Sequence, residues 1–280
     1  MVVKIVTDST ADLPVRVAKE LKITVIPAYL RFGNEVYRDR IDISEDQFYD
    51  RLINDQTHPT TEPPTPQDFA AVYDDLSRKA DGIVSIHISG ELSATYNSAI
   101  QGKKLVNTDC PIEVVDSRLV TMGLGLLVIS AVSIIASEEF PPQIVERIKK
   151  VIPNIQELGL FDTLKYLALG GRIGKIKAFL GSVLNVKPMI KMNNGELEPF
   201  RQVRNRNDGK DELLKFAKNA GNIQDLSIVY STIPEEAQDF VKQMGPIFPA
   251  DQIKLARLGP VLGVHGGPGI LFVALRVRSD

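Results

Sequence analysis

The chain alternates short apolar runs with segments of helical spacing, which predicts strands separated by helices. Nearly continuous apolar runs predict strands at Lys4–Val6, Ile23–Leu30, Ile83–Ile88, Ile112–Val115, Asp225–Tyr230 and Ile270–Val277. Apolar residues at helical spacing predict helices at Ser44–Ile53, Gln67–Lys79, Tyr96–Leu105, Met122–Ala136, Gln143–Val151 and Pro234–Met244. Another helix is expected after Thr10, with Pro14 near its first turn and Asp12 as its N-cap. Repeated strand–helix units favour an α/β fold with a mostly parallel sheet.

The length of the chain favours two domains. At 280 residues it is long for one domain and comfortable for two. The pattern breaks at Phe140–Pro142, and the second half differs in its charge distribution. We expect an N-terminal α/β domain at residues 1–151, with its sheet flanked by helices, and a C-terminal α/β domain at residues 152–280.

The segment Met122–Ala136 contains no charged residue. It is shorter than the roughly 20 residues that a membrane-spanning helix needs. It also follows directly on a predicted strand, so we expect a helix buried inside an α/β domain.

Composition and charge narrow the class of protein. An apolar fraction of 44% with 24% charged residues is ordinary for a soluble globular protein, and the net charge of −2 argues against nucleic-acid binding. The one cysteine, Cys110, cannot form an internal disulfide, which favours a reducing compartment. Met1–Val6 has the pattern of a strand rather than of a charged leader, so we expect a cytoplasmic location.

A cluster of hydroxyl groups follows the predicted strand that ends near Ile88. Ser89, Gly90, Ser93 and Thr95 lie between this strand and the next helix. Free backbone N–H groups and hydroxyls at a helix start favour an anionic ligand, so this loop is a candidate site for a carboxylate or a phosphate. The alternative is that Ser89 and Ser93 are ordinary helix caps.

Two further polar positions are candidates for ligand contact. His265 lies in the glycine-rich segment Gly263–Gly269, where we expect a turn that lets a ligand approach the backbone closely. A neutral histidine could donate to a carboxylate and a protonated one could pair with it. Thr60 and Thr61 begin the proline-rich segment that ends at Pro66, which we expect to be a stiff, extended loop. A buried carbonyl partner for His265 and a plain surface linker for the threonines are the alternatives.

A basic segment lies in the second half of the chain. Residues 163–206 carry nine Lys and Arg against two acids, although the whole chain is slightly acidic. Such a segment favours a surface for an anionic partner, and a solvated helix face is the alternative.

Other chemistries lack their motifs. Gly266–Gly269 has neither the lysine nor the following helix of a phosphate-binding loop, and Gly123–Gly125 is an incomplete dinucleotide motif. His58 and His87 lie far from one another in sequence, without metal-ligand spacing. We therefore expect no metal and no nucleotide cofactor in this chain.

Six segments, in this order, resemble the DegV family of bacterial lipid-binding proteins. They are Lys4–Pro14 (KIVTDSTADLP), Thr61–Pro66 (TEPPTP), Ser89–Ser98 (SGELSATYNS), Val115–Gly125 (VDSRLVTMGLG), Asp162–Ile173 (DTLKYLALGGRI) and His265–Gly269 (HGGPG). The resemblance covers essentially the whole chain. It implies two α/β domains with a long-chain fatty acid held in a buried tunnel between them. It also implies a lipid-binding carrier subunit of bacterial fatty acid kinase, not catalytic alone, whose separate ATP-binding subunit converts the fatty acid to acyl phosphate for phospholipid synthesis.

The resemblance also implies roles for particular residues. Thr61 and Ser93 would hold the fatty-acid carboxylate, with His265 beside it. The supporting loop positions would be Thr60, Ser89, Gly90, Gly266 and Gly267. Arg172 and Arg204 would face the kinase subunit or the phosphate, and membrane contact would be at most transient. The chain departs from the family's pattern at Glu62, Ala94 and Gln202.

A fatty acid also needs an apolar channel. The helix Met122–Ala136 is one candidate wall. The others are the apolar residues Phe161, Leu164, Leu167, Phe179, Leu180, Val183 and Leu184.

Two other functions use the same residues. A self-contained hydrolase or acyltransferase would use Ser93 as nucleophile and His265 as base. A regulatory module would couple lipid occupancy to a partner through the basic segment.

Overall fold

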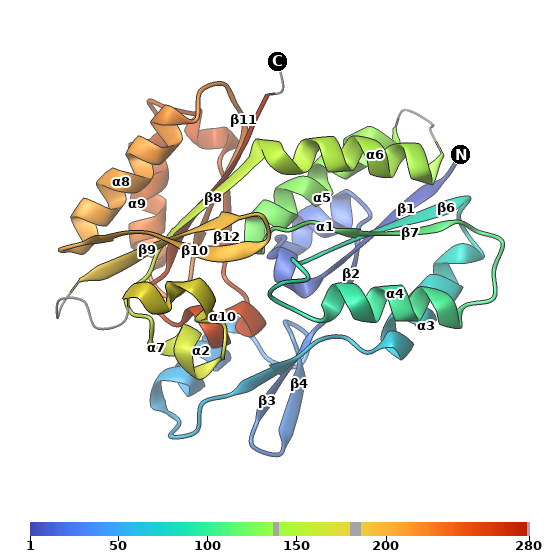
Figure 1. The fold of residues 1–280 in the computed structure, drawn as a ribbon, viewed down its shortest axis with the longest axis horizontal. Helices are drawn as coiled ribbons and strands as arrows, with labels where there is room; N and C mark the ends of the chain where they lie inside the picture. The colour runs from blue at the N-terminus through green and yellow to red at the C-terminus, as the bar shows by residue number, and fades with distance from the viewer. Residues whose placement is uncertain (137–139, 180–185, 279–280) are drawn as a thin grey trace.

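The structure is a computed structural model that describes residues 1–136, 140–179 and 186–278. Its strands form three sheets (Figure 1). The first is a parallel sheet in the order β2-β1-β6-β7, formed by Thr24–Ile26, Val3–Asp8, Gly82–His87 and Ile112–Asp116. The second is mixed, in the order β10-β9-β8-β13-β11-β12, formed by Glu196–Val203, Lys187–Asn193, Ile155–Leu160, Leu271–Val277, Ile223–Tyr230 and Lys254–Arg257. The third is a small antiparallel sheet in the order β4-β3-β5, formed by Glu35–Arg38, Tyr29–Phe32 and Thr60–Glu62.

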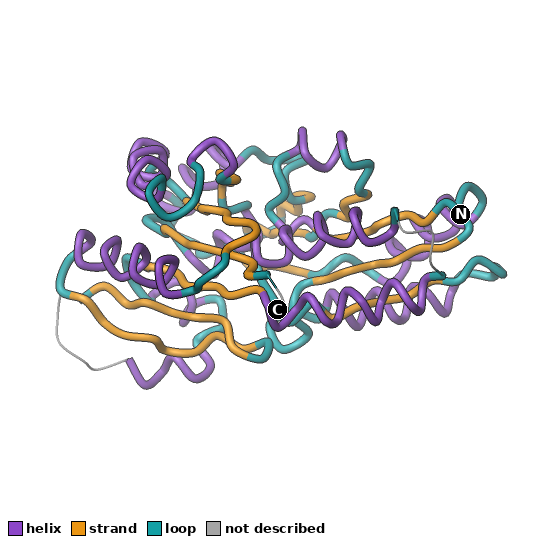
Figure 2. The backbone as a smooth tube through the Cα atoms, turned by 90° about the horizontal axis from the view of Figure 1, so that it is seen from above, coloured by secondary structure: helices purple, strands orange, loops and turns teal. Residues whose placement is uncertain are grey.

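Helices cover these sheets. The α-helices of the described residues are α1 (Val15–Glu20), α2 (Glu45–Asn54), α3 (Pro66–Ser77), α4 (Thr95–Leu105), α5 (Thr121–Ile135), α6 (Pro141–Val151), α7 (Lys165–Leu169), α8 (Arg206–Asn219), α9 (Pro234–Met244) and α10 (Pro260–Gly266). Short 3₁₀ turns lie at η1 (Ser9–Ala11), η2 (Ile152–Asn154), η3 (Gly174–Phe179) and η4 (Ala250–Gln252). The parallel sheet and the mixed sheet lie toward opposite ends of the long axis, with the small sheet below them (Figure 1). Figure 2 shows the strands and helices from above.

The helix α5 lies between the two large sheets. It contacts β1 and β6 of the parallel sheet and β8, β11 and β13 of the mixed sheet. Leu124 and Leu127 are fully buried, and one apolar core continues from one sheet through this helix to the other. A helix that is buried on almost every side can carry no charge, which explains the uncharged segment and confirms the predicted buried helix.

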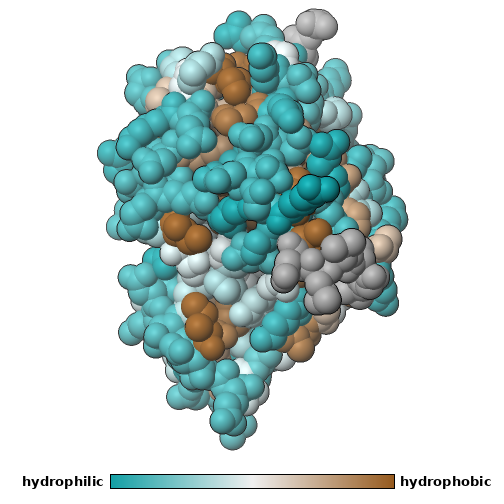
Figure 3. Space-filling model, turned by 90° about the vertical axis from the view of Figure 1, so that its left-hand side faces the viewer, coloured by the Kyte–Doolittle hydropathy of each residue, from teal (hydrophilic) through white to brown (hydrophobic). Residues whose placement is uncertain are grey.

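The remaining helices complete the layers. The helices α3 and α4 cover the other face of the parallel sheet, and α8 and α9 cover the other face of the mixed sheet. The face on the left of Figure 1 is mainly hydrophilic, with apolar residues showing in small separate groups (Figure 3). In the part of the chain that the structure describes, no helix is both long enough and apolar enough to cross a membrane.

The structure confirms the α/β class and corrects four local predictions. Ile23–Leu30 is two strands in different sheets, because the chain turns between Ile26 and Tyr29. Asp12 is a buried residue with φ of 50° and does not cap α1, whose N-cap is Pro14. Thr60 and Thr61 form strand β5 rather than a loop.

The glycine-rich turn expected around His265 is also wrong. The residues Pro260–Gly266 form the helix α10, with Pro260 at its first position. Its glycines allow close packing, since a Cβ at Gly263 would lie 2.5 Å from the Phe48 ring.

The two large sheets are formed by different parts of the sequence. Residues 3–116 supply the parallel sheet, and residues 155–277 supply the mixed sheet. The shared core at α5 joins them, and the division into two domains stays a prediction.

Candidate ligand-binding site

A cavity of about 90 Å³ lies where the parallel sheet, the mixed sheet and α10 meet. One water needs roughly 10–15 Å³, so the cavity exceeds the space of a single buried water several times over. Thr10, Ile88 and Val120 reach it from the carboxyl ends of β1, β6 and β7, the edge at which α/β sheets bind ligands. The lining is formed by Thr10, Thr61, Ile88, Leu92, Ser93, Val120, Thr121, Phe161, Leu167, Arg172, Leu197, Leu258, Val261, Leu262, His265, Gly266, Ile270 and Phe272.

The lining is mostly apolar and includes six polar side chains. Thr10 and Thr121 donate their hydroxyls to buried carboxyl groups. The other four, Thr61, Ser93, Arg172 and His265, form a group that we call the polar mouth. They come from β5, the loop before α4, the segment after α7, and α10. Such a cavity suits a ligand with an apolar body and a polar end.

Thr61 and His265 contact each other directly. The Thr61 hydroxyl lies 2.9 Å from Nε2 of His265. Pairing of Thr61 with Leu30 fixes the strand that carries the hydroxyl, and the last turn of α10 carries the imidazole. On the other side of the ring lies Gly170, where a Cβ would come within 2.1 Å of Nδ1, so only glycine leaves room for this ring position.

The imidazole of His265 is neutral at physiological pH. Burial is the largest cause, and the positive charges of Arg172 and His58 add to it, so that the pKa of His265 is lowered to about 3. Of the two protonation states open from the sequence, the structure selects the neutral one, which acts through hydrogen bonds rather than charge.

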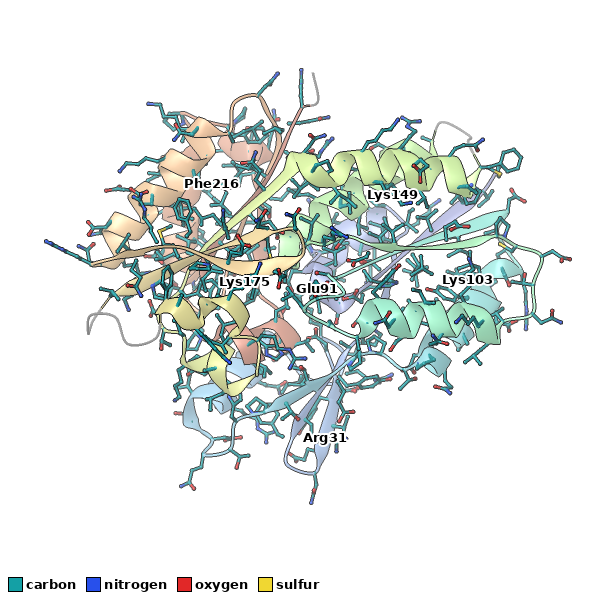
Figure 4. All side chains as sticks on the ribbon, viewed as in Figure 1. Arg31, Glu91, Lys103, Lys149, Lys175 and Phe216 are labelled. Atoms are coloured by element: carbon teal, nitrogen blue, oxygen red, sulfur yellow. The ribbon has the colours of Figure 1, made fainter. Side chains whose placement is uncertain are left out.

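Ser93 lies in a tight loop beside this pair. Its backbone N–H donates to the Ser89 carbonyl, and its hydroxyl lies 2.9 Å from that of Thr95. Arg172 donates through Nε to the Leu92 carbonyl at 3.4 Å, which joins this loop to the segment after α7. Figure 4 labels Glu91 of this loop and Lys175 of η3 in the middle of the view.

The predicted supporting residues have different surroundings. Gly266 lines the cavity, and Gly267 ends α10 with φ of 77°. Thr60 is exposed on the strand that carries Thr61. Ser89 is buried and donates to the Gly195 carbonyl at 2.6 Å, while the N–H of Gly90 donates to Asp116 at 3.2 Å. Ser89 and Gly90 therefore stabilise the loop through contacts outside the cavity lining.

The two predicted arginines lie in different places. Arg172 is exposed at the polar mouth, where its Nη1 donates to the Gly170 carbonyl at 2.7 Å. Arg204 is exposed between β10 and α8, outside the cavity lining. Several other cations of the basic segment pair with acids, such as Lys175 with Glu196. The further pairs are Lys187 and Arg206 with Asp162, Lys191 with Glu198, and Arg201 with Glu212.

The expected apolar wall is partly wrong. Phe161 and Leu167 line the cavity, but the helix α5 contributes only Thr121, because the rest of it is packed between the sheets. Leu164 and Phe179 pack against the core. Leu180, Val183 and Leu184 lie outside the described residues. Thr10, Val120 and Thr121 were missed, although their positions just after predicted strands could have indicated them.

The arrangement does not form the nucleophile–base pair of a hydrolase. Nε2 of His265 contacts Thr61, and the hydroxyl of Ser93 contacts Thr95. A serine nucleophile needs a hydrogen-bonded base that a third group orients, and these described side chains are arranged otherwise. Among the described residues, no three His, Cys, Asp or Glu side chains are grouped to hold a metal ion.

The fold and the cavity define an α/β protein with an amphipathic ligand pocket between two sheets. A family model described as "Uncharacterised protein, DegV family" matches residues 2–277. The chain therefore belongs to the DegV family, as its motifs indicated. It is 32% identical to a DegV domain-containing protein of Deinococcus radiodurans, covering 100% of both chains. It is 30% identical to a DegV domain-containing protein of Caldanaerobacter subterraneus, covering 96% of this chain and 98% of the relative.

Solved structures share the whole fold. A DegV family protein of Thermus thermophilus, described by its fatty-acid binding, superimposes with a TM-score of 0.91 at 29% identity, covering 99% of this chain and 100% of the other. A stearic acid-binding protein of Eubacterium ventriosum gives a TM-score of 0.88 at 30% identity, covering 98% of each chain.

Proposed function

We propose that this protein binds a long-chain fatty acid, with the carboxylate at the polar mouth and the acyl chain along the apolar lining. The observation that carries the proposal is a mostly apolar cavity whose lining includes the polar mouth. The related structures that are named for fatty-acid binding support it.

The polar mouth suits a carboxylate. Thr61 and Ser93 can each donate a hydroxyl hydrogen, and Arg172 supplies a positive charge beside them. Donation by Thr61 requires neutral His265 to carry its proton on Nε2 and to donate to the Thr61 oxygen, so that the Thr61 hydrogen is left for the carboxylate. This group of residues sets the position of the carboxylate.

The acyl chain supplies most of the affinity. Each buried methylene contributes roughly 0.8 kcal/mol before the costs of ordering the chain, so a long tail outweighs the roughly 1–2 kcal/mol expected from the polar mouth. The tail would lie against apolar side chains such as Leu197 and Phe272.

Native mass spectrometry of the purified protein, followed by organic extraction, tests this function. We expect a bound fatty acid at one molecule per chain. Thr61→Val should weaken binding of hexadecanoic acid about tenfold, because it removes one hydrogen bond to a charged group. Thr60→Val, on the exposed side of the same strand, is the matched control and should bind normally. Purified protein that contains no fatty acid and does not bind added fatty acid would overturn the proposal.

We further propose that the bound carboxylate is presented to a separate ATP-dependent kinase subunit that forms acyl phosphate for phospholipid synthesis, in the cytoplasm. The exposed Arg204 lies outside the cavity, which suits a contact with a partner. Arg204→Glu should abolish phosphorylation by the kinase and leave fatty-acid affinity unchanged. Arg172→Glu should reduce both, because Arg172 lines the cavity. Full phosphorylation of the Arg204 variant would exclude Arg204 from the contact.

A further inference from the structure

The cavity wall at the carboxyl ends of the parallel strands is held from behind by three buried carboxyl groups. Asp8, Asp12 and Glu157 are 0%, 1% and 2% exposed, and each lies outside the cavity lining. Each accepts at least one hydrogen bond from a residue that lines the cavity. Asp12 also accepts one from Gly259, which directly follows the lining residue Leu258. We call this part of the lining the carboxyl-backed wall; it comprises Thr10, Ile88, Val120, Thr121 and Leu258.

Asp8 holds two members of the wall. It accepts hydrogen bonds from the hydroxyl and the N–H of Thr10, the latter at 3.1 Å, and from the N–H of Ile88 at 3.3 Å. Its second oxygen lies 2.9 Å from Nδ1 of His87. Nε2 of His87 lies 2.6 Å from Ser85, which accepts from Tyr73 at 2.8 Å, so a fully buried chain of side chains fixes Asp8.

Asp12 holds the neighbouring part of the wall. It accepts from the Thr121 hydroxyl and, at 2.9 Å, from the N–H of Gly259, which follows Leu258. Arg40 lies 2.9 Å from the same carboxyl group. Burial is the largest cause that raises the pKa of Asp12 to about 7.

Glu157 holds Val120. The N–H of Val120 donates to its carboxyl group at 3.4 Å, at the start of α5. A Cβ at Gly123 would lie 2.2 Å from this carboxyl group, so the glycine lets the helix approach it. Burial is the largest cause that raises the pKa of Glu157 well above its ordinary value.

These contacts turn the hydrogen-bond donors of the wall away from the cavity. The hydroxyls of Thr10 and Thr121 and the N–H groups of Thr10, Ile88 and Val120 all point to carboxyl groups. A charged group of a ligand at this wall would lose its hydration without gaining these donors, because the buried carboxyl groups already accept their hydrogens. The polar mouth offers the opposite environment, with hydroxyls and Arg172.

From this contrast we propose that the carboxyl-backed wall makes the pocket selective for long-chain monocarboxylic acids over dicarboxylic acids of the same length. Asp8 and Asp12 are then positioning residues for specificity. Within the cavity, an acyl chain anchored at the polar mouth meets this wall and the other apolar side chains of the lining, so a second carboxylate inside the cavity meets the same surroundings. The inference rests on the proposed function and adds the substrate class that the site rejects.

The test compares hexadecanoic acid with hexadecanedioic acid by competition against a fluorescent fatty-acid probe. It is done at about pH 8, above the pKa of Asp12, so that this group is ionised. We expect the wild-type protein to prefer the monocarboxylic acid by at least about 100-fold. Asp12→Asn removes one negative charge and leaves Arg40 beside Thr121, and it should reduce this preference at least about tenfold.

A matched variant controls the test. Glu45→Gln removes a carboxylate that pairs with the same Arg40 at 3.1 Å but lies away from the cavity, and it should keep the full preference.

The outcomes separate the two proposals. Binding of both acids with equal affinity by the wild-type protein would overturn the selectivity and leave fatty-acid binding intact. An unchanged preference in Asp12→Asn, or the same reduction in Glu45→Gln, would remove the role of the buried carboxyl groups. Failure of hexadecanoic acid to bind at all would overturn the proposed function and this inference with it.

Discussion

At the scale of single residues, the polar mouth depends on a glycine that contributes no functional group of its own. Gly170 ends α7 with φ of −78°, which any residue can adopt, so its role is the space that it leaves for the His265 ring. A side chain there would separate the imidazole from Thr61.

Gly170→Ala should therefore weaken fatty-acid binding about tenfold with a smaller effect on folding, because the added methyl group displaces His265. Probe displacement and the melting temperature of the same samples check this. Ala168→Ser, at an exposed position on the same helix, is the control. Normal binding by Gly170→Ala would show that the ring can shift without harm.

The neutral state of His265 predicts a pH dependence of stability. Because burial and nearby positive charges lower its pKa from 6.5 to about 3, the unfolded chain binds more protons between these values. The contribution of His265 to the free energy of unfolding therefore rises with pH across this window and levels off above it.

Urea unfolding of wild-type protein and His265→Gln measures this contribution as a difference. The difference should grow by at least about 1 kcal/mol between roughly pH 4.5 and 7. Asp12 and Asp39, whose raised pKa values act in the opposite direction, are present in both proteins and cancel. A difference that is constant with pH would mean that His265 is not buried in the neutral form.

The sequence predicted part of the site at this scale. Motifs indicated Thr61, Ser93 and His265, and the structure brings all three to one cavity. Spacing along the chain cannot tell which side of a loop a hydroxyl faces, so Ser89 was expected near the ligand but contacts Gly195. Thr10 and Thr121 were missed because no motif marks them, and only their positions after predicted strands could have indicated them.

At the scale of elements, α5 has two partners rather than one. Its residues pack on the parallel sheet on one side and on the mixed sheet on the other. A cavity in this helix would weaken both contacts at once.

Leu127→Ala should lower the free energy of unfolding by about 2–5 kcal/mol, as for other large-to-small changes in a core. Leu127 is fully buried, and Ser133 on the same helix is exposed. Urea denaturation of Leu127→Ala with Ser133→Ala as control measures the effect. A loss below about 1 kcal/mol would show that the core relaxes around the cavity.

The elements that were predicted well are those whose pattern is local. Runs such as Ile83–Ile88 and Ile112–Val115 became β6 and β7, and the uncharged segment became α5. The helix α10 was missed because glycines usually end helices, whereas here Gly263 gives Phe48 room. The strands of the basic segment, β9 and β10, depend on pairing with β8 and with each other, which no local pattern shows.

At the scale of the whole molecule, the two large sheets share one apolar core. It contains Val84 and Ile86 of the parallel sheet together with Ile190 and Phe272 of the mixed sheet. Neither sheet can lose this core alone without exposing the apolar surface of the other.

We therefore expect one cooperative unfolding transition for the whole chain. Calorimetry should give a calorimetric enthalpy equal to the van't Hoff enthalpy, and a saturating fatty acid should raise the single melting temperature. Residues 152–280 expressed alone should not give a cooperative transition, because α5 would be missing from their sheet. Two separate transitions would contradict a shared core and support independent domains.

The position of α5 also limits how members of this family can recombine. A hybrid that joins residues 1–116 of one relative to the second half of another must take α5 from one parent, and that helix then meets a foreign sheet on one side. Substitutions along this helix must suit two surfaces, one encoded before the helix in the sequence and the other after it. Exchange between relatives at about 30% identity should therefore succeed only when α5 travels with compensating changes in β8 and β13.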